Sequence, residues 1–166
     1  KMGPLLTALA DYIELTRYKY SALGYPPYQW VENSAPPPWA ILAKPLAQCR
    51  VGLIGSGGIY TTGQVAFHYR DDLGIRSVDT RAPTSALRAT HFAYDLTDAR
   101  SDPNVVFPID TLRGLAAEHY IGALAERAYA FMGGIYSSRK VRETLAPELA
   151  DRMVRDAVDV VLLVPV

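Results

Sequence analysis

The sequence is poor in cysteine, since Cys49 is the single thiol among 166 residues. One cysteine cannot form an internal disulfide or a multi-thiolate metal site, and a chain without disulfides favours a reducing compartment, the cytoplasm. No apolar run reaches the roughly 20 residues that cross a bilayer, and the N-terminus lacks the basic-then-apolar layout of a signal peptide. The sequence therefore predicts a soluble, cytoplasmic protein.

Net charge is also absent, because 17 Lys and Arg residues balance 17 Asp and Glu residues. Without an overall electric field the chain has no general attraction to nucleic acid or to an anionic membrane surface. The length fits one domain with its own apolar core. We expect a single α/β domain over residues 1–166, made of an N-terminal helix (1–23), an extended arm (24–49) and a sheet core (50–166).

The first two of these segments differ in their composition. Apolar residues recur at three- and four-residue spacing from Leu5 to Tyr20, which predicts a helix that ends before Gly24 and Pro26. Residues 24–49 are rich in proline, tyrosine and tryptophan, which predicts an extended arm without regular secondary structure. Such an arm either wraps its own domain or covers a partner.

From residue 50 onward, short apolar runs alternate with helical patterns, as in a largely parallel sheet covered by helices. We predict a Rossmann-like α/β fold with a mostly parallel sheet and helices on both faces. The expected strands are 50–54, 75–79, 91–94, 129–132 and 158–166, and the expected helices are 111–118, with Asp110 as its N-cap, and 137–157, with a break or kink at Pro147. The run at 158–166 is the most apolar, so we expect a central strand that is buried on both faces.

A glycine-rich turn follows the first predicted strand of this core. The segment GSGGIY at 55–60 resembles a dinucleotide-binding loop, but Tyr60 stands where that motif needs its third glycine. A loop for a small anion or a substrate carboxylate fits better, with Ser56, Gly57, Gly58, Tyr60 and Thr61 as candidate binding residues. The alternative is a purely structural turn at a strand end.

The densest polar cluster begins at His91. Acid–base catalysis by His91, with Asp95 as the carboxylate that orients its ring, is chemically reasonable, and Tyr94, Asp102 and Asn104 are candidate substrate-binding residues. The alternative is that these Asp and Asn residues cap helices and form turns. The three histidines carry no metal-binding motif, so we expect no metal.

The cysteine itself has two interpretations. Cys49 precedes Arg50, whose charge could favour a thiolate, but a lone cysteine beside a strand is more often a small buried apolar residue.

Five stretches of the chain are distinctive when taken together: DYIELTRYKYSALGYPPYQW (11–30), VGLIGSGGIYTTGQ (51–64), DPNVVFPIDTLRGL (102–115), IGALAERAYAFMGGIY (121–136) and VDVVLLVPV (158–166). Together they resemble the selenoprotein B family of glycine, sarcosine, betaine and D-proline reductases. The resemblance implies a substrate-specific reductase subunit that cleaves the carbon–nitrogen bond of an amino acid or betaine-like substrate, next to its carboxylate. It also implies a pyruvoyl-containing partner subunit that holds the amine.

In that family a strand like VVLLVPV leads directly into a selenocysteine or cysteine, which attacks the substrate. The resemblance therefore places the redox residue just after Val166 in full-length relatives, and this chain contains no cofactor and no counterpart of that residue. Selenocysteine is encoded by a codon that otherwise means stop, so a gene read without the insertion machinery would yield a product ending here.

Two other functions remain open from the sequence. One is a non-catalytic binding or assembly protein that uses its arm and an exposed sheet edge, and an exposed apolar C-terminal strand predicts a homo-oligomer. The other is an independent small-molecule enzyme that uses His91 and Asp95.

Overall fold

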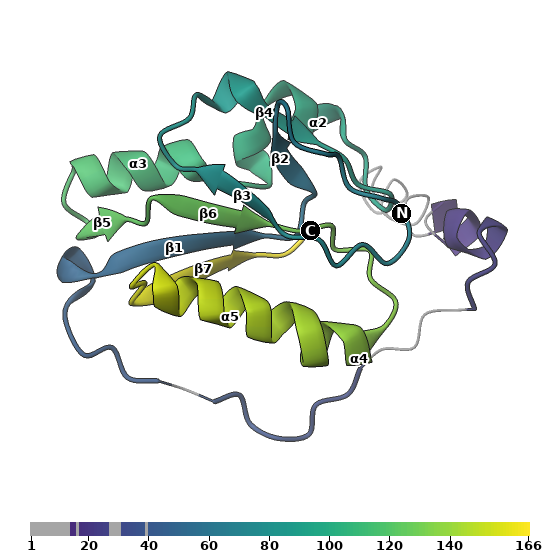
Figure 1. Cartoon of the computed structure of the whole chain (residues 1–166), viewed down its shortest axis with the longest axis horizontal. Helices are drawn as coiled ribbons and strands as arrows, with labels where there is room; N and C mark the ends of the chain where they lie inside the picture. The colour runs from purple at the N-terminus through teal and green to yellow at the C-terminus, as the bar shows by residue number, and fades with distance from the viewer. Residues whose placement is uncertain (1–13, 16, 27–30, 39) are drawn as a thin grey trace, which may run out of the picture.

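The fold is built around one strand, β1 (Arg50–Gly55), which lies at the centre of a mostly parallel sheet (Figure 1). The computed structural model describes residues 14–15, 17–26, 31–38 and 40–166. Three short strands pair with β1 in parallel: β5 (Ala123–Leu124), β6 (Arg127–Ala130) and β7 (Val160–Val164). A fourth, β3 (Arg76–Asp79), pairs antiparallel with β6 at one edge. The chain is therefore a mixed α/β protein, as the alternating pattern predicted.

The register places two strands in line along one side of β1. Arg50 and Val51 pair with β5, whereas Ile54 and Gly55 pair with β6. On the other side, β7 runs along β1 from the Val51–Val160 pair to the Gly55–Val164 pair. The carboxyl ends of β1, β6 and β7 consequently meet at one edge of the sheet.

The C-terminal strand corrects one prediction. Within the described chain β7 pairs with β1 alone, so it is an edge strand and not a central one. Leu162 and Leu163 are 38% and 66% exposed, so the strand is not buried on both faces. Its apolar sequence reflects the tendency of these residues to be buried, but it does not fix how many neighbours the strand has.

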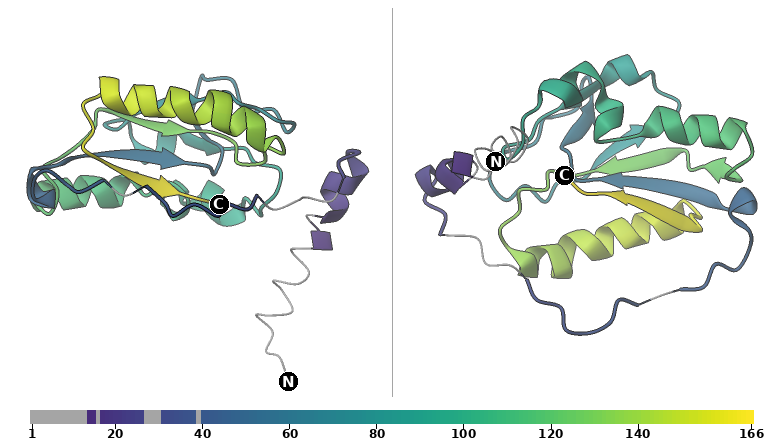
Figure 2. Two further views of the ribbon diagram at one scale, coloured as in Figure 1. Left: turned by 90° about the horizontal axis from the view of Figure 1, so that it is seen from below. Right: turned by 180° about the vertical axis from the view of Figure 1, so that it is seen from behind.

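Each face of the sheet is covered by a helix (Figure 2, left). On one face α3 (Ile109–Ala117) packs with Val51 and Leu53 into a core that also contains the fully buried Phe107. On the other face α5 (Ala146–Arg155) packs with Ile54 into a second core. Alternate residues of β1 point to opposite faces, so this one strand contributes to both cores.

A small two-stranded sheet lies beside the main one, formed by β2 (Ile59–Thr61) and β4 (Leu87–Ala89). The short helices η2 (Thr84–Ala86), α2 (Thr97–Ser101) and η3 (Pro103–Val105) complete this region. The predicted strand at 91–94 is wrong, because these residues form a bend after β4. His91 thus lies in a loop and not at the end of a strand.

The helix predicted at 111–118 is present as α3, but its N-cap is Pro108 and not Asp110. The Asp110 carboxylate instead accepts hydrogen bonds from the Thr84 hydroxyl at 2.6 Å and the Asn104 amide at 3.0 Å, and it pairs with Arg113. Asp110 therefore ties α3 to η2 and η3.

The long helix predicted at 137–157 is also present, and it is irregular where Pro147 was expected to disturb it. It runs through α4 (Ser138–Lys140), the π-helical turn η4 (Val141–Leu145) and α5. Proline has no amide hydrogen, so the turn that precedes Pro147 cannot form its regular hydrogen bond.

The N-terminal helix is seen in part, as residues 14–15 and 17–22, and the rest of that prediction lies outside the described residues. The described arm, 31–38 and 40–45, has no helix or strand and is exposed until the short helix η1 (Leu46–Gln48) leads into β1. Among the helices described, none is both long and apolar enough to span a membrane.

Candidate functional site

The glycine-rich loop at 55–58 joins the ends of three strands. The Ser56 amide donates to the Val164 carbonyl of β7 at 3.0 Å, and the Gly58 amide donates to the Phe131 carbonyl after β6 at 3.0 Å. The Val166 amide donates to the Ser56 hydroxyl at 2.9 Å. Ligand sites of open α/β sheets lie beyond this edge, so the loop has the expected position for a site.

Glycine is required at position 58 for two reasons. Its φ of +69° is in the left-handed region, and a Cβ atom there would lie 1.9 Å from the Thr90 carbonyl oxygen. The Thr90 amide in turn donates to the Gly58 carbonyl at 2.9 Å. The loop is thereby held against the segment that carries His91, and its amides at Ser56 and Gly58 are occupied by backbone partners.

His91 and Tyr94 lie against this loop. The Tyr94 hydroxyl donates to the Gly57 carbonyl at 2.8 Å, and the centres of the Tyr94 and His91 rings are 4.7 Å apart. His91 is 9% exposed, and its Nδ1 accepts a hydrogen bond from the Ala93 amide at 3.0 Å. A neutral ring that accepts at Nδ1 carries its hydrogen on Nε2.

Burial lowers the pKa of His91 from 6.5 to about 4, because the charged ring would lose its hydration. The ring is therefore neutral near pH 7. Its Nε2 is buried and has no hydrogen-bond partner among the described residues. Buried polar atoms without a partner are rare, so this nitrogen calls for an explanation.

Asp95 does not orient His91, contrary to the sequence-based expectation. Its carboxylate accepts hydrogen bonds from the Thr97 hydroxyl at 2.7 Å and the Thr97 amide at 2.9 Å. These bonds, more than the nearby charges of Lys19 and Arg100, lower the pKa of Asp95. The geometry gives no acid–base pair, since His91 takes its bond from Ala93 instead.

His91, Tyr94 and Asp95 nevertheless share one pocket of about 390 Å³. Lys19 from the N-terminal helix and Arg100 from α2 also line it. No motif in the sequence marks these two residues, because only the packing of the N-terminal helix against the loop brings them to one place.

The remaining candidate residues belong to other contacts. The Tyr60 hydroxyl accepts from Thr90 at 3.4 Å, and the Thr61 amide donates to the Gln64 side chain at 2.8 Å. Asp102 accepts from the amide and the side chain of Asn104, both at 2.9 Å, and Asn104 continues to Asp110. Asp102 and Asn104 thus form the capping network that was the alternative for them.

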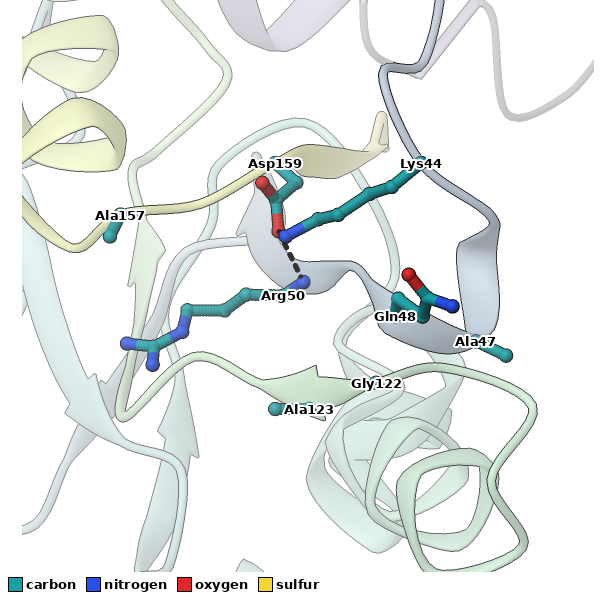
Figure 3. A pocket seen from close by; sticks show the side chains of 8 residues that line it. All are labelled: Lys44, Ala47, Gln48, Arg50, Gly122, Ala123, Ala157 and Asp159. Atoms are coloured by element: carbon teal, nitrogen blue, oxygen red, sulfur yellow. Dashed lines mark hydrogen bonds and ion pairs between the residues drawn. The ribbon is translucent and has the colours of Figure 1, made fainter.

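A second pocket, of about 530 Å³, lies at the opposite end of the strands (Figure 3). Asp159 there pairs with the Lys44 ammonium at 2.7 Å and accepts from the Arg50 amide at 2.7 Å, and these partners lower its pKa. The Asp159 carboxylate already has these partners, and the pocket lies at the amino ends of the strands, away from the edge where α/β sheets bind ligands.

Cys49 is completely buried, and its thiol contacts the carbonyls of Lys44 and Pro45 at 3.5 and 3.4 Å. This environment fits the small buried residue of the two interpretations. Across the described ranges, no three His, Cys, Asp or Glu side chains gather closely enough to hold a metal ion.

A mixed α/β sheet with a polar pocket beside its parallel strand ends defines the class of open α/β proteins, which bind small ligands at this edge. Within that class, residues 32–166 match the family model for glycine/sarcosine/betaine reductase selenoprotein B. The chain belongs to this family, as the five sequence stretches predicted.

Two curated relatives are similar to the chain. D-proline reductase subunit gamma of Acetoanaerobium sticklandii is 34% identical over 134 residues, which cover 81% of this chain and 55% of the relative. Glycine reductase complex component B subunit gamma of Symbiobacterium thermophilum is 30% identical over 131 residues, 72% of this chain and 29% of the relative. The chain thus spans about half or less of these relatives' length. No solved structure matches it.

Proposed function

We propose that the chain is part of a substrate-specific reductase subunit that cleaves the carbon–nitrogen bond of an amino acid or betaine-like substrate. Family membership and two relatives named as subunits of reductases support this role. We further propose a Rossmann-like arrangement, a cytoplasmic location and a pyruvoyl-containing partner subunit.

The observation that carries the proposal is the place of Val166. Its amide is bonded to the Ser56 hydroxyl, and its side chain lies 3.3 Å from the point where a Cβ on Gly57 would stand. A residue that follows Val166 therefore starts beside the glycine loop, at the edge where the parallel strands end. In the family, this residue is the selenocysteine or cysteine that supplies the attacking selenolate or thiolate.

This chain's own residues would shape the surroundings of that position. Gly57 and Gly58 let the loop approach Val166 and Thr90 closely, and Tyr94 fixes the Gly57 carbonyl. The neutral His91 ring adds no charge to the pocket beside them. An independent enzyme based on a His91–Asp95 pair is not favoured, because the two side chains are bonded to other partners.

Peptide mass spectrometry of the full-length gene product tests the redox residue. The protein is alkylated with iodoacetamide under reducing conditions and digested, and the peptide that contains residues 156–166 is sequenced. We expect this peptide to continue into an alkylated selenocysteine or cysteine after Val166. Any other residue at the next position contradicts the proposed chemistry.

A second function, assembly through the open edge of the sheet, is favoured by β7. This strand pairs only with β1 within the described chain, and it exposes Leu163 at 66%. An apolar edge strand without charged residues pairs readily with another strand. Two results together would favour this function over the reductase: self-association into a homo-oligomer that increases with protein concentration, and no consumption of glycine, sarcosine, betaine or D-proline.

A further inference from the structure

The pocket beside the glycine loop has an excess of positive charge. Lys19 and Arg100 line it, and Asp95 is the one carboxylate among its lining residues. In the part of the chain that the structure describes, neither the Lys19 ammonium nor the Arg100 guanidinium takes part in an ion pair or a side-chain hydrogen bond. The Oδ1 atom of Asp95 accepts two hydrogen bonds, from the hydroxyl and the amide of Thr97. Two unpaired cations against one anion leave the pocket one positive charge in excess.

The pocket also contains a polar group that lacks a partner. His91 is nine-tenths buried and lines the pocket, and its Nε2–H makes no hydrogen bond. This buried nitrogen is closed off from the pocket space, so it is an unsatisfied atom behind the wall and not one of the donors for a ligand. In the glycine loop the Ser56 and Gly58 amides are already bonded to backbone carbonyls, so the charged donors of Lys19 and Arg100 are the stronger attraction for an anion here.

The rest of the wall is apolar. Leu15, Phe92 and Leu96 line the same pocket. A ligand that matches this surface has one negatively charged end and a short aliphatic body. A dianion such as phosphate matches it less well, because the Asp95 carboxylate would repel the second negative charge.

We propose that this pocket binds the carboxylate of a small organic acid, held between the Lys19 ammonium and the Arg100 guanidinium, with its aliphatic part against Leu15 and Phe92. The guanidinium is suited to this task, since its planar donors match both oxygens of a carboxylate. The inference deepens the proposed function by naming the residues that would hold the acid group of the substrate. It rests on the proposed function in one respect, which is that the bound acid is a substrate of the reductase.

Titration of the uniformly ¹⁵N-labelled protein with sodium propionate near pH 7, followed by two-dimensional amide NMR, tests the site. We expect saturable shifts of the amides of residues 91–100, and no such shifts with the neutral isostere propionamide. Arg100→Gln and Lys19→Gln should each weaken propionate binding about tenfold, as expected for loss of a charge-assisted bond. Arg142→Gln and Lys140→Gln are matched controls, because both side chains lie on the helix that leads into α5 and not in this pocket.

Three results would overturn the proposal: equal shifts with propionate and propionamide, tighter binding of inorganic phosphate than of propionate, or equal losses in the pocket variants and their controls. The readout needs no redox chemistry, so it separates this inference from the proposed function. Propionate binding without any reductase activity would support the carboxylate site and contradict the proposed reductase function. Reductase activity that persists in Arg100→Gln with an unchanged KM would support the reductase function and contradict the carboxylate site.

Discussion

His91→Asn is the substitution that tests the buried histidine most sharply. The Oδ1 atom of Asn can take the place of Nδ1 and accept the hydrogen bond from the Ala93 amide, but the Asn side chain does not titrate. The wild-type and variant proteins therefore differ mainly in one ionisable group. We expect the variant to lose part of the pH dependence of the free energy of unfolding.

The sign follows from the direction of the pKa shift. The pKa of His91 is about 4 in the folded protein and near its ordinary 6.5 in the unfolded chain. Between these values the unfolded state binds more protons, so the contribution of the neutral ring is present above pH 6.5 and is lost as the pH falls toward 4. Between pH 7 and pH 5 this loss is about 2 kcal/mol.

Urea denaturation at pH 7 and pH 5 measures the effect. The wild-type protein should lose about 2 kcal/mol more than His91→Asn over this interval. His119→Asn is the matched control: His119 is exposed with a φ of +61°, a conformation that Asn tolerates. Equal pH dependence in the wild-type protein and His91→Asn would refute the burial argument, as would an equal effect of His119→Asn.

Three further substitutions test the sheet edge and its loop. Gly58→Ala should lower the free energy of unfolding by about 4 kcal/mol or more, because the new methyl group meets the Thr90 carbonyl. The control Gly63→Ala, also at positive φ but in open space, should lower it by about 1–2 kcal/mol; thermal unfolding measures both variants. Leu163→Lys should shift sedimentation profiles toward the monomer, and Val154→Lys on α5 should not; equal profiles would count against assembly through β7. Ser56→Ala removes the acceptor of the Val166 amide and should speed hydrogen exchange there; unchanged exchange would mean that this bond does not hold the end of β7.

The elements with clear apolar patterns could be predicted from the sequence. The strands at β1, β3 and β6 and the helix α3 lie within a few residues of their predicted places. Such patterns report which residues prefer burial, but not which neighbours they find. For this reason the apolar pattern of 158–166 predicts a central strand, although β7 pairs with β1 alone and lies at the side of the sheet.

The candidate site was predictable in part, for a similar reason. The glycine loop, His91 and Tyr94 are indeed in contact, because the loop follows a strand and its glycines permit a close approach. Lys19 and Arg100 could not be found, since their meeting depends on how the N-terminal helix packs. The pairing of His91 with Asp95 failed because nearer backbone partners compete for both side chains.

The most direct test of the reductase proposal is the activity of the full-length subunit in its own complex. The tagged gene product is purified from its source cells with its bound partners, supplied with a dithiol reductant, and incubated separately with glycine, sarcosine, betaine and D-proline. Reductive cleavage of one of the four, lost when the residue after Val166 is replaced by Ala in a complex that still assembles, is the predicted result. An intact complex that cleaves none of them would contradict the proposed function.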